Sequence, residues 1–185
     1  DVVLSKDHEV IVFHDYSLKR LCNLEKNVAE LHSNELRQIN LLDTKSKIPT
    51  LEEMFYQVDS RVPILIEIKS GFNPIIEERL VELTRTYQGE VAFQSFDQKA
   101  CEWFRDNAPY YNTGLIISSN EIKKNTIQEL NIDFIAVDIN NIESVDVQNI
   151  RKNNLPTFTW TINNDEKLKL SQKFADNCIF ENLLI

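Results

Sequence analysis

Residues 64–93 of this sequence read ILIEIKSGFNPIIEERLVELTRTYQGEVAF, and this stretch decides the class of fold. Its first five residues, Ile64 to Ile68, are apolar apart from one glutamate, which predicts a buried strand. Apolar residues at helical spacing follow from Ile75 to Tyr87, and Pro74 suits the first turn of that helix. Val91 to Phe93 predicts a second strand. A strand, a helix and a strand in this order form a βαβ unit, in which the two strands run parallel.

The same rhythm repeats along the chain. Short apolar runs bounded by turn residues alternate with longer segments of helical periodicity, as expected for parallel strands covered on both faces. The predicted strands are Ile11–Phe13 (with Val2–Leu4 leading into it), Ile64–Ile68, Val91–Phe93, Leu115–Ile117, Phe134–Val137, Thr157–Trp160 and Cys178–Phe180. The predicted helices are Ser33–Gln38, Ile75–Tyr87, Gln98–Asn107, Glu121–Leu130, Ser144–Asn153 and Asp165–Phe174. Residues 1–185 are expected to form a single domain.

The number of predicted strands favours one α/β architecture. Seven strands is one fewer than the eight that close a (β/α)8 TIM barrel, and the shortage lies at the amino-terminal end. An open doubly wound sheet is the alternative, but the sequence has no glycine-rich dinucleotide fingerprint. We therefore predict a TIM barrel that lacks its first strand-helix unit in this chain.

Composition excludes several classes of function. The formal net charge of −9 and the pI near 4.9 argue against nucleic-acid binding, because no basic stripe is available to contact phosphates. The longest apolar runs are far shorter than the roughly 20 residues that span a bilayer, so no transmembrane segment is expected. The three cysteines have no metal-binding or redox spacing, which favours free thiols in a reducing, cytoplasmic compartment.

Polar residues follow the predicted strands at their carboxyl ends, where barrel enzymes place their reactive groups. They include His14, Asp15, Glu67, Lys69, Ser95, Asp138 and Trp160. Glu67 and Lys69 are two residues apart in one strand, so their side chains are expected on the same face. An imidazole, carboxylates and an ammonium on one rim indicate a catalytic site.

Five motifs in a fixed order make the chemistry more specific. The run DVVLSKD (1–7) leads to VIVFHD (10–15) and LKR (18–20), and IPTLEE (48–53), IEIK (66–69), QSFD (94–97) and TWTIN (159–163) follow. In these motifs the sequence resembles the glycerophosphodiester phosphodiesterases over nearly its whole length. The resemblance implies hydrolysis of glycerophosphodiesters to an alcohol and glycerol 3-phosphate, with a divalent cation, Ca²⁺ or Mg²⁺.

The resemblance also implies a role for each matching residue. Asp1 matches the second acid of the family's E-x-D metal pair, and Glu67 matches its third metal carboxylate, which are oxygen ligands suited to such a cation. His14 matches a catalytic histidine, the general acid for the leaving alkoxide. Lys69 would hold the phosphate. The alternatives are a surface or capping histidine for His14, a strand-end ion pair for Lys69 and a buried salt bridge for Glu67.

Two aromatic residues complete the implied site. Trp160 resembles the family tryptophan on the alcohol-binding side of the pocket, and Phe96 is expected to assist it. The alternative for both is a place in the hydrophobic core.

The sequence departs from the family pattern before Asp1. It contains no H-R-G strand and no P-E-N-T segment, which would supply a first catalytic histidine, an arginine and a metal carboxylate. We therefore expect the chain as given to be nearly inactive, and its unpaired strand edges to favour association between copies. Two other functions remain open: a related phospholipase C- or D-like phosphodiesterase on the same fold, and a non-catalytic barrel that serves as a binding module.

Overall fold

The computed structural model describes residues 1–69, 71–118 and 124–183. The chain divides into two compact units, Asp1–Phe93 and Gln94–Ile185, and each is described by itself. The predicted single domain stays a prediction. Among the described residues, no helix has both the length and the apolar character needed to cross a membrane.

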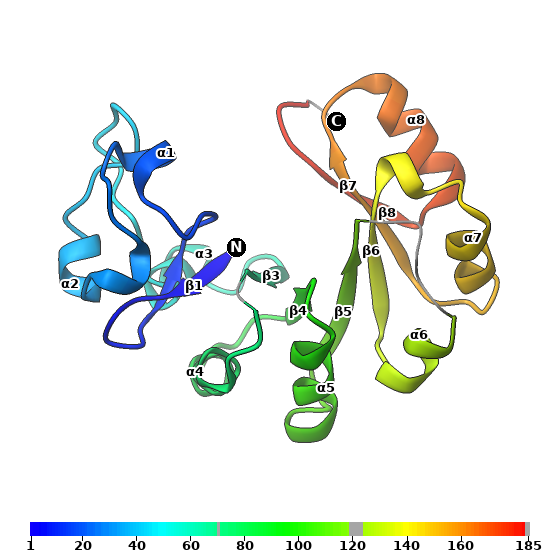
Figure 1. Cartoon of the computed structure of the whole chain (residues 1–185), viewed down its shortest axis with the longest axis horizontal. Helices are drawn as coiled ribbons and strands as arrows, with labels where there is room; N and C mark the ends of the chain where they lie inside the picture. Colours follow the sequence, from blue (N-terminus) through cyan, green and yellow to red (C-terminus); the bar gives the residue numbers. More distant parts are fainter. Residues whose placement is uncertain (70, 119–123, 184–185) are drawn as a thin grey trace. The chain divides into compact units, whose positions relative to one another are not determined.

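The first unit combines short strands with short helices (Figure 1). Its elements are β1 (Val2–Leu4), β2 (Val10–Val12), α1 (Lys19–Cys22), the 3-10 helix η1 (Val28–Glu30), α2 (Ser33–Leu36), α3 (Leu51–Val58), β3 (Ile64–Ile68) and α4 (Pro74–Thr84). Strand β4 (Val91–Ser95) lies at the boundary between the units. Three of these elements, α2, β3 and α4, match predicted segments to within three residues at either end.

The strand pairing at the amino-terminal end differs from the prediction. β1 pairs parallel with β3, with Val2 opposite Ile68, and pairs antiparallel with β2, with Val2 opposite Val12. The prediction of Ile11–Phe13 as a parallel strand was therefore wrong: β2 is the second arm of a hairpin, and β1 is the parallel strand. The turn between them is closed by hydrogen bonds from the backbone N–H of Ser5 to the carbonyl of Glu9 and from the Glu9 N–H to Ser5 Oγ. A short loop of this kind can join only antiparallel neighbours.

The core of the first unit lies beneath this hairpin. Eight side chains form one buried cluster: Val3, Ile11, Phe13, Leu18, Val28, Leu31, Leu36 and Ile48. Several come from the irregular segment that follows β2. That segment therefore covers the hairpin's apolar face, which would otherwise face water.

Helix α3 was not predicted, although its start has a clear signal. Thr50 accepts a hydrogen bond from the backbone N–H of Glu53, and Glu53 accepts one from the backbone N–H of Thr50, which is a capping box. Leu51 and Phe55 are buried on the inner face of the helix. The helix has only eight residues, so its apolar periodicity is short.

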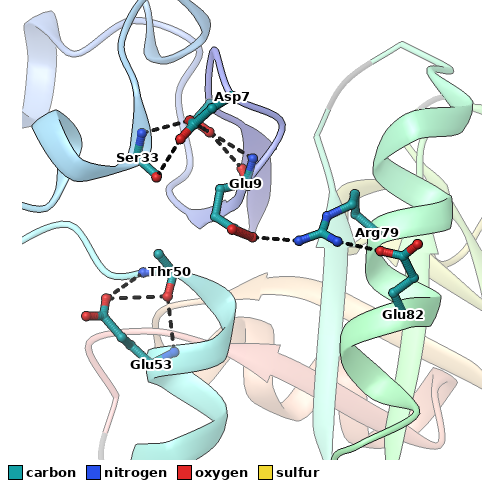
Figure 2. A network of polar contacts seen from close by, with 8 residues as sticks. Asp7, Glu9, Ser33, Thr50, Glu53, Arg79 and Glu82 are labelled. Carbon is teal, nitrogen blue, oxygen red and sulfur yellow. Dashed lines mark hydrogen bonds and ion pairs between the residues drawn. The ribbon is translucent and has the colours of Figure 1, made fainter.

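Figure 2 shows this capping box beside other polar contacts of the first unit. Glu9, at the end of the hairpin turn, faces Arg79 of α4, with 2.9 Å between Glu9 Oε1 and Arg79 Nη2. Arg79 also contacts Glu82 one turn along the same helix. This ion pair connects the hairpin to α4 on the surface of the unit.

The second unit is a regular series of parallel strands and helices. Its elements are α5 (Gln98–Asn107), β5 (Asn112–Ile117), α6 (Lys124–Leu130), β6 (Phe134–Asp138), the 3-10 helix η2 (Ile139–Asn141), α7 (Val145–Arg151), β7 (Thr157–Ile162), α8 (Asp165–Phe174) and β8 (Asn177–Phe180). The predictions of α5 and α8 are confirmed to the residue. Of the predicted helix Glu121–Leu130, residues 121–123 lie outside the described residues.

Strands β5, β6, β7 and β8 pair in chain order, each parallel to the next. Buried side chains from these strands and from α5, α6 and α7 form one core cluster. Gly114 of β5 is required by this packing, because a Cβ there would lie 2.1 Å from the ring of Phe134. Asp97 and Asn164 cap α5 and α8, as predicted. Both units are thus of the predicted α/β class.

Candidate active site

The ends of β1 and β3 bring two carboxylates together. Asp1 immediately precedes β1, and Glu67 is in β3. The parallel register pairs Val2 with Ile68, which places Asp1 and Glu67 in neighbouring positions on adjacent strands. The backbone N–H of Lys69 donates to the carbonyl of Val2 at 3.3 Å, so the pairing continues to the end of β3.

Lys69 lies between these carboxylates, on the same face of β3 as Glu67, and only this shared face was predicted. Its Nζ is 2.6 Å from Glu67 Oε1 and 3.4 Å from Asp1 Oδ1. The Lys69 and Glu67 side chains are only 16% and 17% exposed. Lys69 and Glu67 therefore form an ion pair at the end of β3. The remaining contacts of Glu67 bear on whether it can also bind a cation.

One carboxylate oxygen of Glu67, Oε1, makes no hydrogen bond of regular geometry among the described residues. Oε1 is buried, and although Lys69 Nζ is close to it, the approach lacks hydrogen-bond geometry and no donor among the described residues satisfies this atom. A buried carboxylate oxygen without a hydrogen-bond donor is costly unless a ligand completes it. Oxygen donors are the ligands that Ca²⁺ and Mg²⁺ select. Asp1 and Glu67 therefore fit such a cation, although within the described ranges no third acidic, histidine or cysteine side chain joins them.

His14 follows β2 and is held by its neighbour in the sequence. Its Nδ1 lies 2.6 Å from Asp15 Oδ1, and its side chain is 55% exposed. Arg20 donates to both oxygens of Asp15, from Nε at 2.6 Å and from Nη2 at 2.7 Å. These hydrogen bonds from Arg20, assisted by His14, lower the pKa of Asp15 to about 2. Asp15 is thus a carboxylate at neutral pH, and His14 Nε2 has no hydrogen-bond partner among the described side chains.

Tyr16 connects these two parts of the first unit. Its hydroxyl donates to the backbone carbonyl of Lys69, so the loop that carries His14 is tied to the end of β3. No sequence motif predicted a role for Tyr16. Its position directly after the His14–Asp15 pair is the feature that could have indicated one.

The aromatic residues Phe96 and Trp160 contact each other in the second unit. Their rings are edge to face, with centroids 5.7 Å apart. Trp160 Nε1 donates to the carbonyl of Ala136 at 3.1 Å, which fixes the indole, while Phe96 is 45% exposed. Neither residue is among the buried core residues, so the alternative interpretation of both as core aromatics is wrong.

Two other strand-end residues serve the backbone around them. Asp138 accepts hydrogen bonds from the backbone and side-chain amides of Asn140. The hydroxyl of Ser95 accepts from the N–H of Asp97. Both contacts shape the turn that follows a strand.

The family model described as the glycerophosphoryl diester phosphodiesterase family matches residues 1–182. The chain belongs to this family. Its members are phosphoric diester hydrolases, so the chain is of that enzyme class.

Two relatives of this chain in the phosphodiesterase family are similar to it over most of its sequence. A putative glycerophosphodiester phosphodiesterase of Bacillus subtilis is 26% identical over 182 residues, covering 90% of this chain and 74% of the relative. A glycerophosphodiester phosphodiesterase of Caldanaerobacter subterraneus is 27% identical over 184 residues, covering 91% and 74%.

Solved structures share the fold. A phosphodiesterase of Oleispira antarctica, in complex with the product sn-glycerol-3-phosphate, has a TM-score of 0.88 at 19% identity and covers 97% of this chain and 78% of that one. A glycerophosphodiester phosphodiesterase of Parabacteroides distasonis has a TM-score of 0.82 at 20% identity. The predicted resemblance to this family is confirmed.

Proposed function

We propose that this protein contributes to the hydrolysis of glycerophosphodiesters to an alcohol and glycerol 3-phosphate with the help of Ca²⁺ or Mg²⁺. The observation that carries the proposal is the cluster of Asp1, Glu67 and Lys69 at the ends of β1 and β3, in which the buried Glu67 Oε1 lies 2.6 Å from Lys69 Nζ and makes no regular hydrogen bond among the described residues. Family membership supports the reaction class, and the product bound to the Oleispira antarctica phosphodiesterase supports the substrate class.

The residues divide the chemistry between them. Asp1 and Glu67 would hold the cation, which when bound neutralises phosphate charge and activates the attacking hydroxyl. Lys69 would bind a phosphate oxygen as a point charge. The oxygen of the attacking hydroxyl forms a new bond to phosphorus and its proton passes to solvent. The P–O bond to the leaving alcohol breaks, and protonated His14 gives its Nε2 proton to the alkoxide oxygen. Phe96 and Trp160 would bind the apolar part of the leaving alcohol.

The 185 residues alone are proposed to turn over slowly. The sequence contains no H-R-G or P-E-N-T segment, and a charge-stabilising site loses most of its power when members of a concerted set are absent. Association through strand edges and a cytoplasmic location stay predictions.

The test compares two forms of the protein in the hydrolysis of glycerophosphocholine, with Ca²⁺, Mg²⁺ or a chelator. One is the 185-residue chain, and the other is a fusion carrying the corresponding amino-terminal segment of a relative. We expect the fusion to be active, the chain nearly inactive, and His14→Ala to abolish the activity of the fusion. Inertness of both forms would overturn the proposal and favour the binding-module reading.

One relative favours a second substrate class. Lysophospholipase D of Rattus norvegicus is 32% identical over 102 residues, which is 49% of this chain and 32% of that protein. Lysophosphatidylcholine in the same assay tests it: faster release of choline from this substrate than from glycerophosphocholine would assign the protein to that class.

A further inference from the structure

Asp15 is a partly buried loop carboxylate held by three hydrogen bonds. Oδ2 accepts from Arg20 Nε, and Oδ1 accepts from both Arg20 Nη2 and His14 Nδ1. The two Arg20 bonds form a bidentate fork, which fixes the plane of the carboxylate as well as its position. The remaining contact is to the imidazole.

Arg20 is itself anchored. It lies on α1, whose first turn is preceded by Leu18, a fully buried member of the core cluster. The backbone N–H of Cys22 donates to the carbonyl of Leu18 at 2.8 Å, closing the turn around Arg20. The guanidinium therefore reaches Asp15 from a hydrogen-bonded helical turn, five residues along the chain.

The ionisation of Asp15 determines which nitrogen of His14 carries a proton. Because hydrogen bonds from Arg20 hold the pKa of Asp15 at about 2, its side chain accepts hydrogen bonds and donates none at neutral pH. Nδ1 must then be the protonated nitrogen of neutral His14. Nε2 is left to take up and release the catalytic proton.

The contribution of this ion pair to folding is limited. The Arg20 side chain is 60% exposed and that of Asp15 21%, so solvent screens the pair from the Arg20 side. Lys19, the next residue on the same helix, pairs with Glu25 and makes no contact with Asp15 among the described interactions. The fork on Asp15 is thus specific to Arg20.

We propose that Arg20 is a positioning residue, which acts through Asp15 to fix the imidazole of His14 with Nδ1 protonated and Nε2 free for proton transfer. This inference rests on the proposed function, in which His14 is the general acid. It adds two residues to the proton-transfer step, neither of which touches the substrate.

The first test reads the tautomer without any activity. The chain has three histidines, so nitrogen NMR of the ¹⁵N-labelled 185-residue chain can resolve each ring, with His14→Gln providing the assignment. We expect neutral His14 to carry its proton on Nδ1, whereas exposed His8 shows the mixture of a free imidazole. Arg20→Met should shift His14 toward that mixture, and Asp15→Leu should complete the shift. Lys19→Met is the matched control and should leave His14 unchanged.

The second test uses the form of the protein that hydrolyses glycerophosphocholine. Arg20→Met should lower kcat on the order of 10- to 100-fold with KM nearly unchanged, as for other residues that orient a reacting group. A p-nitrophenyl leaving group needs no acid, so its release should fall less than threefold. Arg20→Lys should recover only part of the loss, because an ammonium cannot form the fork. In a His14→Ala background, Arg20→Met should add no further loss.

Two results would overturn the inference. The first is a tautomer ratio of His14 that equals that of His8 in the unaltered chain, or a His14 ratio that stays the same in Arg20→Met. The other is a loss of equal size for both leaving groups. If the tautomer is fixed as expected but no phosphodiester is hydrolysed in any form, the positioning holds and the proposed function fails.

Discussion

Two carboxylates of the first unit, Asp7 and Glu67, are used in opposite ways. Asp7 lies in the turn between β1 and β2 and accepts hydrogen bonds from the hydroxyl of Ser5 and from both the N–H and the hydroxyl of Ser33 (Figure 2). Glu67 is more buried, yet its Oε1 has no hydrogen-bond donor among the described residues. The first carboxylate is satisfied by hydrogen bonds from the chain itself, whereas the second contacts the Lys69 ammonium at 2.6 Å and is the proposed cation ligand.

The hydrogen bonds of Asp7 also determine its pKa. Burial would raise the pKa of Asp7, but the hydrogen bonds from Ser5 and Ser33 outweigh it and hold that pKa well below its usual value. A carboxylate that accepts three hydrogen bonds from the chain contributes to the stability of the fold. Asp15 is intermediate, because Arg20 satisfies it and it still faces His14.

The largest effect is expected at Glu67. In the form of the protein that hydrolyses glycerophosphocholine, Glu67→Gln should lower turnover by about 100- to 1,000-fold. An amide oxygen is a weaker cation ligand than a carboxylate, and the negative charge that balances the cation is lost. The free energy of unfolding should fall by about 1 to 3 kcal/mol, because the partly buried Lys69 ammonium loses one of its two charged partners. Steady-state kinetics and urea unfolding measure the two quantities. Ca²⁺ should raise the melting temperature of the unaltered protein and not that of the variant; equal shifts would contradict a cation site here.

Asp7 should affect stability and not turnover. Asp7→Ala removes the acceptor for Ser5 and Ser33 and should lower the free energy of unfolding by about 2 kcal/mol, with no loss of turnover in the folded protein. Asp43→Ala, at an exposed loop position, is the control and should stay within ~0.5 kcal/mol. Chemical denaturation checks both variants. A fall in kcat for Asp7→Ala at temperatures where the variant is fully folded would contradict a purely structural role of Asp7.

The smallest effect concerns the pH dependence of stability at Asp15. Its pKa falls from a usual 3.8 to about 2 in the folded chain, so the unfolded state binds more protons between these values. The stabilisation from Asp15 is therefore complete above about pH 5 and is lost as the pH falls toward 2. The difference in unfolding free energy between the unaltered chain and Asp15→Asn should shrink from pH 6 to pH 3. A difference that stays constant or grows would show that Asp15 is not held as an anion.

Local sequence patterns predicted the second unit well. The helices Gln98–Asn107 and Asp165–Phe174 were predicted to the residue, because a polar cap and an apolar face lie close together in the chain. In the first unit, β2 was assigned to the wrong kind of pairing and α3 was missed. A three-residue strand carries too little periodicity to tell a hairpin arm from a parallel strand.

The candidate site shows the same division. The alternation of side chains along a strand was enough to predict that Glu67 and Lys69 share a face, and their ion pair confirms it. The contact of Tyr16 with the Lys69 carbonyl joins residues 53 positions apart, and no local pattern encodes such a contact.

The sequence by itself determined the α/β class, the family and the residue types at the strand ends, because these depend on spacing and order along the chain. Only the tertiary structure decided which carboxylates are satisfied and which are open. Asp7, Asp15 and Glu67 are all carboxylates, and their sequence neighbours supply only part of their contacts, from Ser5 to Asp7 and from His14 to Asp15. The difference arises from donors brought in by other elements: Ser33 reaches Asp7 and Arg20 reaches Asp15, whereas no donor of hydrogen-bond geometry among the described residues reaches Glu67 Oε1.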